Sequence, residues 1–311
     1  MSGAFAPLGA CAADAYPSRR LTIIVPYGAG GSYDVLARLI GQKIGEQTGQ
    51  QVVVDNRLGA AGRIGMEAAV KSPSDGYTLV TVGNSQVIAP SVYLSVPYDL
   101  RSMSAIAAIG TITNTLLVNP TVPAHTVAEL VALAKANPGK LLFGSGGTGG
   151  ITHLAGELFK SSAGIDIVHV PFKTGSLAVT AQIGNELQIN VVNLLTSLPH
   201  IQAGRLRALG VTGLNRSPYL PAMPTLDEQG IRGYDIQEFH TLFAPAGTPS
   251  TLVVRLNEEI NKALVSPQVK DRMSQQAAEV LTMTPDRTRA YVLAEQDKYA
   301  NIVKTVGIKP D

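Results

Sequence analysis

Residues 21–40 read LTIIVPYGAGGSYDVLARLI, which is an apolar strand, a glycine-rich loop and the start of an amphipathic helix. The same order returns at residues 141–149, LLFGSGGTG, and the glycine pairs stand at 30/31 and 146/147. Each loop opens a helix, so free backbone N–H groups and the positive end of the helix dipole point at whatever the loop holds. The sequence therefore predicts two similar lobes that each offer an anion-binding loop, as in a clamp.

The composition restricts the class of protein. The chain has 311 residues, of which 45% are hydrophobic and 15% charged, with a formal net charge of +2. This is enough apolar content for two ordinary cores. Nucleic acid is excluded as a partner, because there is no basic run and no tryptophan, and aromatic residues make up only 5%.

The first sixteen residues read as processing rather than as structure. Residues 1–16 are predicted to be a signal-peptide remnant or a disordered leader, with Ala10-Cys11-Ala12 as an A-x-A cleavage site. Leu8-Gly9-Ala10-Cys11 also fits a bacterial lipobox, in which Cys11 carries lipid, and this alternative stays open. Cys11 is the only cysteine, so no internal disulfide forms. No apolar run reaches the length of about 18 residues that a membrane span needs.

Hydrophobic periodicity predicts alternating strands and helices. Ser32 is the expected N-cap of the first helix, and Thr248-Pro249 and Thr284-Pro285 each pair an expected N-cap with proline at the first helical position. The expected strands are 21–25, 51–54, 77–82, 141–144, 167–170, 187–192, 205–212 and 239–244, and the expected helices include 64–71, 126–136, 151–162, 249–265 and 285–305. Such alternation is typical of an α/β protein whose mainly parallel sheets are flanked by helices and bind ligands beyond the carboxyl ends of the strands.

The strand at 239–244 is expected to cross back to the first lobe. Lobe 1 is thus predicted to be discontinuous, residues 17–121 plus 240–311, and lobe 2 to be residues 122–239. A hinge is expected near 120–125 and 235–240, where the chain passes between the lobes.

An ordered set of motifs carries a family resemblance. They are VPYGAGGSYD (25–34), DNR (55–57), SDGYTL (74–79), HLAGE (153–157), HVPFK (169–173), LPHI (198–201), GRLRAL (204–209) and FAPAGTP (243–249). Together they resemble the Bug family, the periplasmic substrate-binding receptors of tripartite tricarboxylate transporters. The resemblance runs from about Tyr16 to Ile308.

The resemblance implies a two-lobed, type II-like periplasmic-binding-protein fold that holds a small carboxylate in the interlobe cleft and passes it to membrane permease subunits. It also implies a monomer in the periplasm, and no cofactor is expected. No metal site is expected either, because His125, His200 and His240 have no metal-ligand spacing with one another or with acids. In lobe 1 the implied ligand-binding residues are Tyr27, Gly28, Ala29, Gly30, Gly31, Ser32, Tyr33, Asp34, Asn84 and Ser85. In lobe 2 they are Ser145, Gly146, Gly147, Thr148, Thr152, His153, Lys173, Thr174, Gly175, Ser176 and Asn193.

Departures from the family pattern bear on the ligand. Val192 stands where members often have an acid, and the loop after Lys173 reads Thr174-Gly175-Ser176 instead of small apolar residues. Loss of an acid and gain of two hydroxyls would favour a dicarboxylate or an aromatic carboxylate, provided that these residues line the cleft.

Several alternative interpretations remain. His153 could brace its loop instead of touching ligand, and Lys173 could be a solvated cation. Gly144-x-Gly146-x-x-Gly149 matches the dinucleotide fingerprint, but His169, Val170 and Pro171 occupy the place where a ribose-binding carboxylate should stand, so an enzyme is disfavoured. A ligand sensor for a signalling partner would need the same clamp, and the sequence does not separate it from a transport receptor.

Overall fold

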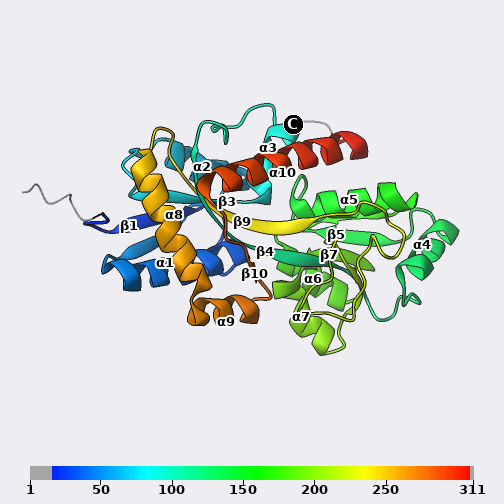
Figure 1. Cartoon of the computed structure of the whole chain (residues 1–311). Coiled ribbons are helices and arrows are strands. Elements are labelled where there is room, and N and C mark those ends of the chain that lie inside the picture. Colours follow the sequence, from blue (N-terminus) through cyan, green and yellow to red (C-terminus); the bar gives the residue numbers. More distant parts are fainter. Residues whose placement is uncertain (1–15, 309–311) are drawn as a thin grey trace, which may run out of the picture.

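The computed structural model describes residues 16–308 (Figure 1). Residues 1–15 of the proposed leader, Cys11 among them, lie outside this range, whereas Tyr16, the last residue of that leader, donates its hydroxyl to the carbonyl of Gly76. The protein is an α/β structure with two lobes, as the sequence predicted, but the strands of both lobes join in one sheet instead of two separate ones. The strands run in the order β2-β1-β3-β9-β4-β7-β5-β6, and β8 and β10 also pair with β4. No helix within residues 16–308 combines the length and the apolar character that crossing a bilayer requires.

The first lobe begins with the predicted β-α-β-α-β unit. Its strands β1, β2 and β3 are parallel. The elements are β1 (Leu21–Val25), α1 (Ser32–Thr48), β2 (Val52–Asn56), the short 3₁₀ helix η1 (Ala60–Gly62), α2 (Arg63–Val70), β3 (Thr78–Val82) and α3 (Asn84–Val92).

Two long antiparallel strands pass between the lobes. They are β4 (Ser104–Val118), which the sequence analysis did not predict, and β9 (Gln237–Ala244). Up to Thr113, β4 pairs with β9 in the first lobe, and from Asn114 it pairs with the strands of the second lobe. Nearly all of β4 is buried, its polar residues included, so its sequence does not alternate regularly between apolar and polar residues. Strand β4 thus belongs to both lobes, because its pairing partner changes along its length. The lobe boundaries at 121/122 and 239/240 stay a prediction.

The second lobe repeats the arrangement with parallel strands next to β4. Its central β7 lies between β4 and β5, and β5 pairs in parallel with β6. The elements are α4 (Val127–Ala136), β5 (Leu142–Ser145), α5 (Ile151–Ala163), β6 (Val168–Pro171), α6 (Gly175–Ile183), β7 (Ile189–Asn193), α7 (Leu194–Gln202) and β8 (Arg207–Val211).

The C-terminal segment returns to the first lobe and then spans both. It comprises α8 (Ser250–Val265), α9 (Pro267–Gln275), β10 (Glu279–Val280) and α10 (Pro285–Val306). Helix α10 packs on α3 of the first lobe and on α5 of the second (Figure 1). Its buried Tyr299 belongs to one apolar cluster that also contains Val80 of β3 and Phe159 of α5, so the two lobes share part of a core on this face.

The predicted helix caps are partly right. Thr284 caps α10 through the Arg287 N–H, as expected. The cap of α1 is Gly31, and Ser32 is the first helical residue, whose hydroxyl donates to Glu238 and does not cap the helix. Thr248 was expected to cap α8, but it donates its hydroxyl to the carbonyl of Pro245, and Pro249 is the cap before Ser250 begins the helix.

Candidate functional site

The second glycine loop faces residues of the first lobe across a cavity between the lobes, and the first glycine loop, Gly28 to Gly31, does not line this cavity. The cavity has a volume of about 150 Å³ and is lined by Ala61, Ser85, Ala89, Val92 and Tyr93 of the first lobe and by Gly146, Gly147, Thr148, Gly149 and Gly150 of the second. Four of the residues predicted from the sequence therefore line it, namely Ser85, Gly146, Gly147 and Thr148. A larger cavity of about 480 Å³ lies between α8 and the start of α10 and contains none of the predicted residues.

The first loop keeps most of its backbone donors free. Gly28 to Gly31 are exposed just before α1. The N–H of Gly30 donates to Asp34 Oδ2 at 2.9 Å, and Asp34 also pairs with Arg38. The N–H groups of Gly28, Ala29 and Gly31 donate to no group within residues 16–308. This loop can therefore present backbone amides to an anion at the N-terminus of α1.

The second loop is braced by its own side chains. The N–H of Gly146 donates to Thr152 Oγ1 at 2.9 Å, that of Gly147 to Ser145 Oγ at 3.1 Å, and that of Gly149 to His153 Nδ1 at 3.1 Å. These three amides are hydrogen-bonded within the protein and are not free for a ligand. The loop therefore differs from the open cradle that its glycines suggested, and His153 takes the bracing role.

A buried serine and two histidines contact one another at the base of this loop. Ser145 Oγ lies 2.6 Å from His169 Nε2, and the rings of His153 and His169 stack with centroids 4.0 Å apart. Burial, and then the neighbouring His153, lower the pKa of His169 to about 4, and burial also lowers the pKa of His153. The Ser145 hydroxyl is fully buried and already receives the Gly147 N–H, so its contact with His169 braces the loop rather than preparing a nucleophile.

The end of β6, where a dinucleotide-binding protein would carry an acid, has none. His169 of β6 points to Ser145, and Asp166 lies before the strand, where it pairs with Lys160 at 3.3 Å. The fingerprint glycines are thus present without the carboxylate that would hold the ribose.

Two tyrosines that flank the first loop in the sequence stack on each other. The rings of Tyr27 and Tyr33 lie 3.9 Å apart and almost parallel. Tyr27 donates to Gln86 Oε1 at 2.8 Å, and Tyr33 donates to Asn84 Oδ1 at 3.2 Å. Asn84 is 1% exposed, and its amide nitrogen donates to Gln237 O and Tyr299 Oη. The polar atoms of Asn84 are therefore occupied within the protein.

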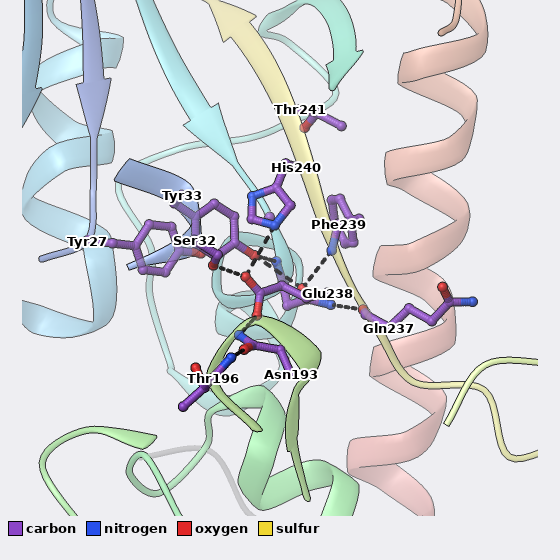
Figure 2. Close-up of polar contacts among 12 residues, drawn as sticks. Tyr27, Ser32, Tyr33, Asn193, Thr196, Gln237, Glu238, Phe239, His240 and Thr241 are labelled. Carbon is purple, nitrogen blue, oxygen red and sulfur yellow. Dashed lines mark hydrogen bonds and ion pairs between the residues drawn. The ribbon is translucent and has the colours of Figure 1, made fainter. Parts of the chain in front are cut away.

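A buried carboxylate joins the two lobes next to these tyrosines (Figure 2). Glu238 of β9 is 6% exposed. Its Oε1 accepts from the Ser32 hydroxyl at the start of α1 and lies 3.2 Å from His240 Nε2. Its Oε2 accepts from Asn193 Nδ2 at 2.7 Å. Asn193 also caps α7 through the Thr196 N–H.

The remaining predicted residues lie on the second lobe. Thr174 caps α6, and Gly175 lies against Gly146, where a Cβ would come within 2.8 Å of the Gly175 nitrogen. Lys173 and Ser176 are exposed. Val192 is 3% exposed in an apolar cluster with Leu117 and Val179, so an acid missing at this position does not change the charge of a cleft.

Sequence reasoning missed Glu238, His240 and His169. Glu238 and His240 stand two positions apart on β9, and such spacing puts both side chains on one face of a strand. The sequence analysis began this strand at residue 239 and so left Glu238 outside it. His169 was noted only as a residue that is not an acid.

Comparison with known proteins gives one family model that matches residues 36–308, described as tripartite tricarboxylate transporter family receptor. Protein BugT of Bordetella pertussis is 36% identical over 311 residues, covering 99% of this chain and 94% of BugT. A protein of Pseudomonas sp. strain P51, described as UPF0065 protein in tcbD-tcbE intergenic region, is 36% identical over 292 residues, covering 93% of this chain and 87% of that protein.

Two solved structures are similar to this chain over nearly its whole length. The structure described as R. palustris Rpa4515 with adipate has a TM-score of 0.88 and 33% identity, covering 95% of this chain and all of that one. Periplasmic binding protein BugD has a TM-score of 0.85 and 29% identity, with the same coverage.

Proposed function

The chain belongs to the tripartite tricarboxylate transporter receptor family, among the Bug-type periplasmic binding proteins, and we propose that it captures a small organic carboxylate between its lobes and delivers it to a permease of that transporter class. The members of this family are substrate-binding receptors, and the absence of catalytic activity in this chain stays a prediction. We also propose that it works in the periplasm as a monomer.

One observation carries the proposal. The exposed amides of Gly28, Ala29 and Gly31 have no partner within the described residues, and they lie at the N-terminus of α1. Backbone amides at a helix N-terminus bind carboxylates well because the dipole and the free donors act together. The cavity lined by Ser85 and by Gly146 to Gly150 offers further space for a small ligand between the lobes.

The ligand class follows from chemistry and from one relative. Rpa4515, which is 33% identical, was solved with adipate, a dicarboxylate. The neutral donors near the cavity, such as the hydroxyls of Ser85 and Thr148, suit hydrogen bonds to a carboxylate or a hydroxyl. Di- and aromatic carboxylates therefore belong in the test panel, although the argument from Val192 does not support them.

The test is a thermal-shift screen against mono-, di- and tricarboxylates, aliphatic and aromatic, followed by calorimetry. A ligand at a hundredfold excess over its Kd adds about 2.7 kcal/mol to the free energy of unfolding, which is easily detected as a rise in melting temperature. Amides of the same acids serve as matched neutral controls. Equal shifts for acids and amides, or no shift with any acid, would contradict the proposal.

A further inference from the structure

The interlobe carboxylate of Glu238 occupies donors that were predicted to hold the ligand. Ser32 and Asn193, one from each lobe, both donate to it. Each lies at a helix N-terminus, Ser32 as the first residue of α1 and Asn193 as the cap of α7. Two positive helix ends and two side-chain donors thus converge on one place, and the protein fills this place with its own anion.

The surroundings keep this carboxylate ionised. Burial by itself would raise the pKa of Glu238, but the contact with His240 and the hydrogen bonds of Ser32 and Asn193 outweigh it and lower the pKa. The other titratable groups here are phenols. Burial raises the pKa of Tyr27 to about 12 and that of Tyr33 well above its usual value, so both stay neutral.

The charge sits close to the amides that are free for ligand. Glu238 Oε1 contacts the hydroxyl of Ser32, which directly follows the Gly28 to Gly31 loop. A buried charge acts on its neighbourhood through protein rather than through water, so it is weakly screened. An anion bound at this loop therefore feels repulsion from Glu238, and the repulsion grows with the number of negative charges on that anion.

We propose that Glu238 sets the charge selectivity of the interlobe site, favouring ligands with one carboxylate, or with a carboxylate and a cationic group, over di- and tricarboxylates. The inference rests on the proposed function and narrows its ligand class. The negative charge near the site then comes from Glu238 on β9 and not from the end of β7, where family members often have an acid and this chain has Val192.

The experiment compares the wild type with Glu238→Gln, which keeps the shape of the side chain and removes its charge. Calorimetry is run on propionate, succinate and tricarballylate, which carry one, two and three carboxylates. The affinity of the variant should rise about three- to fivefold per ligand charge, so that the gain is largest for the tricarboxylate. Glu259→Gln on α8 is the matched control, since Glu259 is also buried but bonds to Gln47 and Arg255.

The outcomes separate the two proposals. If the wild type binds at least one acid and the Gln variant gains equally for all three or for none, the charge-selectivity inference is wrong and the receptor function stands. If neither protein binds any acid, the receptor function is wrong as well. Should the Gln variant fail to fold, His240→Gln takes its place: it keeps the Glu238 carboxylate and replaces the imidazole 3.2 Å from it with an amide that cannot take up a proton, and it should weaken tricarballylate more than propionate. Equal affinities in that variant would overturn the inference.

Discussion

Ser145 Oγ at the end of β5 lies 2.6 Å from His169 Nε2 on β6, and this contact holds the base of the second glycine loop. The same Ser145 hydroxyl receives the Gly147 N–H, and the His169 ring stacks on His153, whose Nδ1 receives the Gly149 N–H. Two strands and one helix thus meet through neutral imidazoles, and the loop depends on their staying neutral.

Stability should therefore fall in mild acid. The pKa of His169 is about 4 in the folded protein, below the ordinary value near 6.5 for an unfolded chain, so the unfolded state takes up the proton first as the pH falls. The contribution of His169 to stability is complete above about pH 6.5 and is lost as the pH drops to about 4. The loss amounts to about 1–2 kcal/mol of unfolding free energy after a discount for partial exposure. Urea unfolding at pH 7, 5.5 and 4 measures it.

The control removes the titrating ring. His169→Gln keeps an acceptor for Ser145 and should lose less stability than the wild type between pH 7 and 4. His125→Gln changes an exposed histidine and should follow the wild type. Identical pH profiles for wild type and His169→Gln would contradict the assignment.

Gly83, between β3 and α3, is required by the tyrosine stack. A Cβ at this position would overlap the ring of Tyr33, which is held between Tyr27 and His240. Gly83→Ala should lower the free energy of unfolding by about 2–3 kcal/mol, because the ring has no free space to enter. Gly28→Ala is the control, since nothing lies within 4 Å of a Cβ there, and it should change stability by less than about 0.5 kcal/mol.

Gly28 also tests the anion loop without disturbing the fold. Its backbone does not need glycine, whereas Gly30 has a φ of +81° and would be strained by any side chain. Gly28→Val should therefore keep the melting temperature and weaken every carboxylate at least tenfold, by blocking approach to the free amides. Tight carboxylate binding by the folded variant would show that the ligand does not use this loop.

Two threonines of the second lobe should behave differently. Thr148 is exposed and lines the interlobe cavity, while Thr174 caps α6 through the Leu177 N–H at 3.3 Å. Thr148→Ala should weaken the preferred ligand by roughly five- to a hundredfold at unchanged stability. Thr174→Ala should lower the free energy of unfolding by about 1 kcal/mol through loss of the cap. Calorimetry and denaturant unfolding on both variants distinguish the two effects, and the reverse pattern would reassign the residues.

Ligand should change how far the lobes are closed. The chain passes between the lobes in β4 near Thr113 and Asn114 and at the start of β9, and bending there would close the cavity. Small-angle scattering with a ligand identified by thermal shift should show a smaller radius of gyration than without it. An unchanged radius at saturation would argue against a hinge in these strands.

The sequence by itself determined the local structure. The glycine loops, the strands on either side of them and the helices that follow depend on short-range periodicity and on where glycine and proline stand, so they could be predicted from the chain, and the ordered motifs identified the family. The path of β4 could not be predicted, because a strand buried on both faces has no alternation to reveal it.

Only the tertiary structure decided which polar groups remain for a ligand. Ser32 and Asn193 stand far apart in the chain and were predicted to hold the ligand, but the fold brings both of them onto the carboxylate of Glu238. The same holds for Ser145, Thr152 and His153, whose acceptors are taken by the amides of their own loop. Hydrogen-bond partners are chosen by which strand ends meet in space, and a buried polar group must find a partner wherever the fold offers one. The chemistry of the two loops was therefore set by the fold, although their positions were set by the sequence.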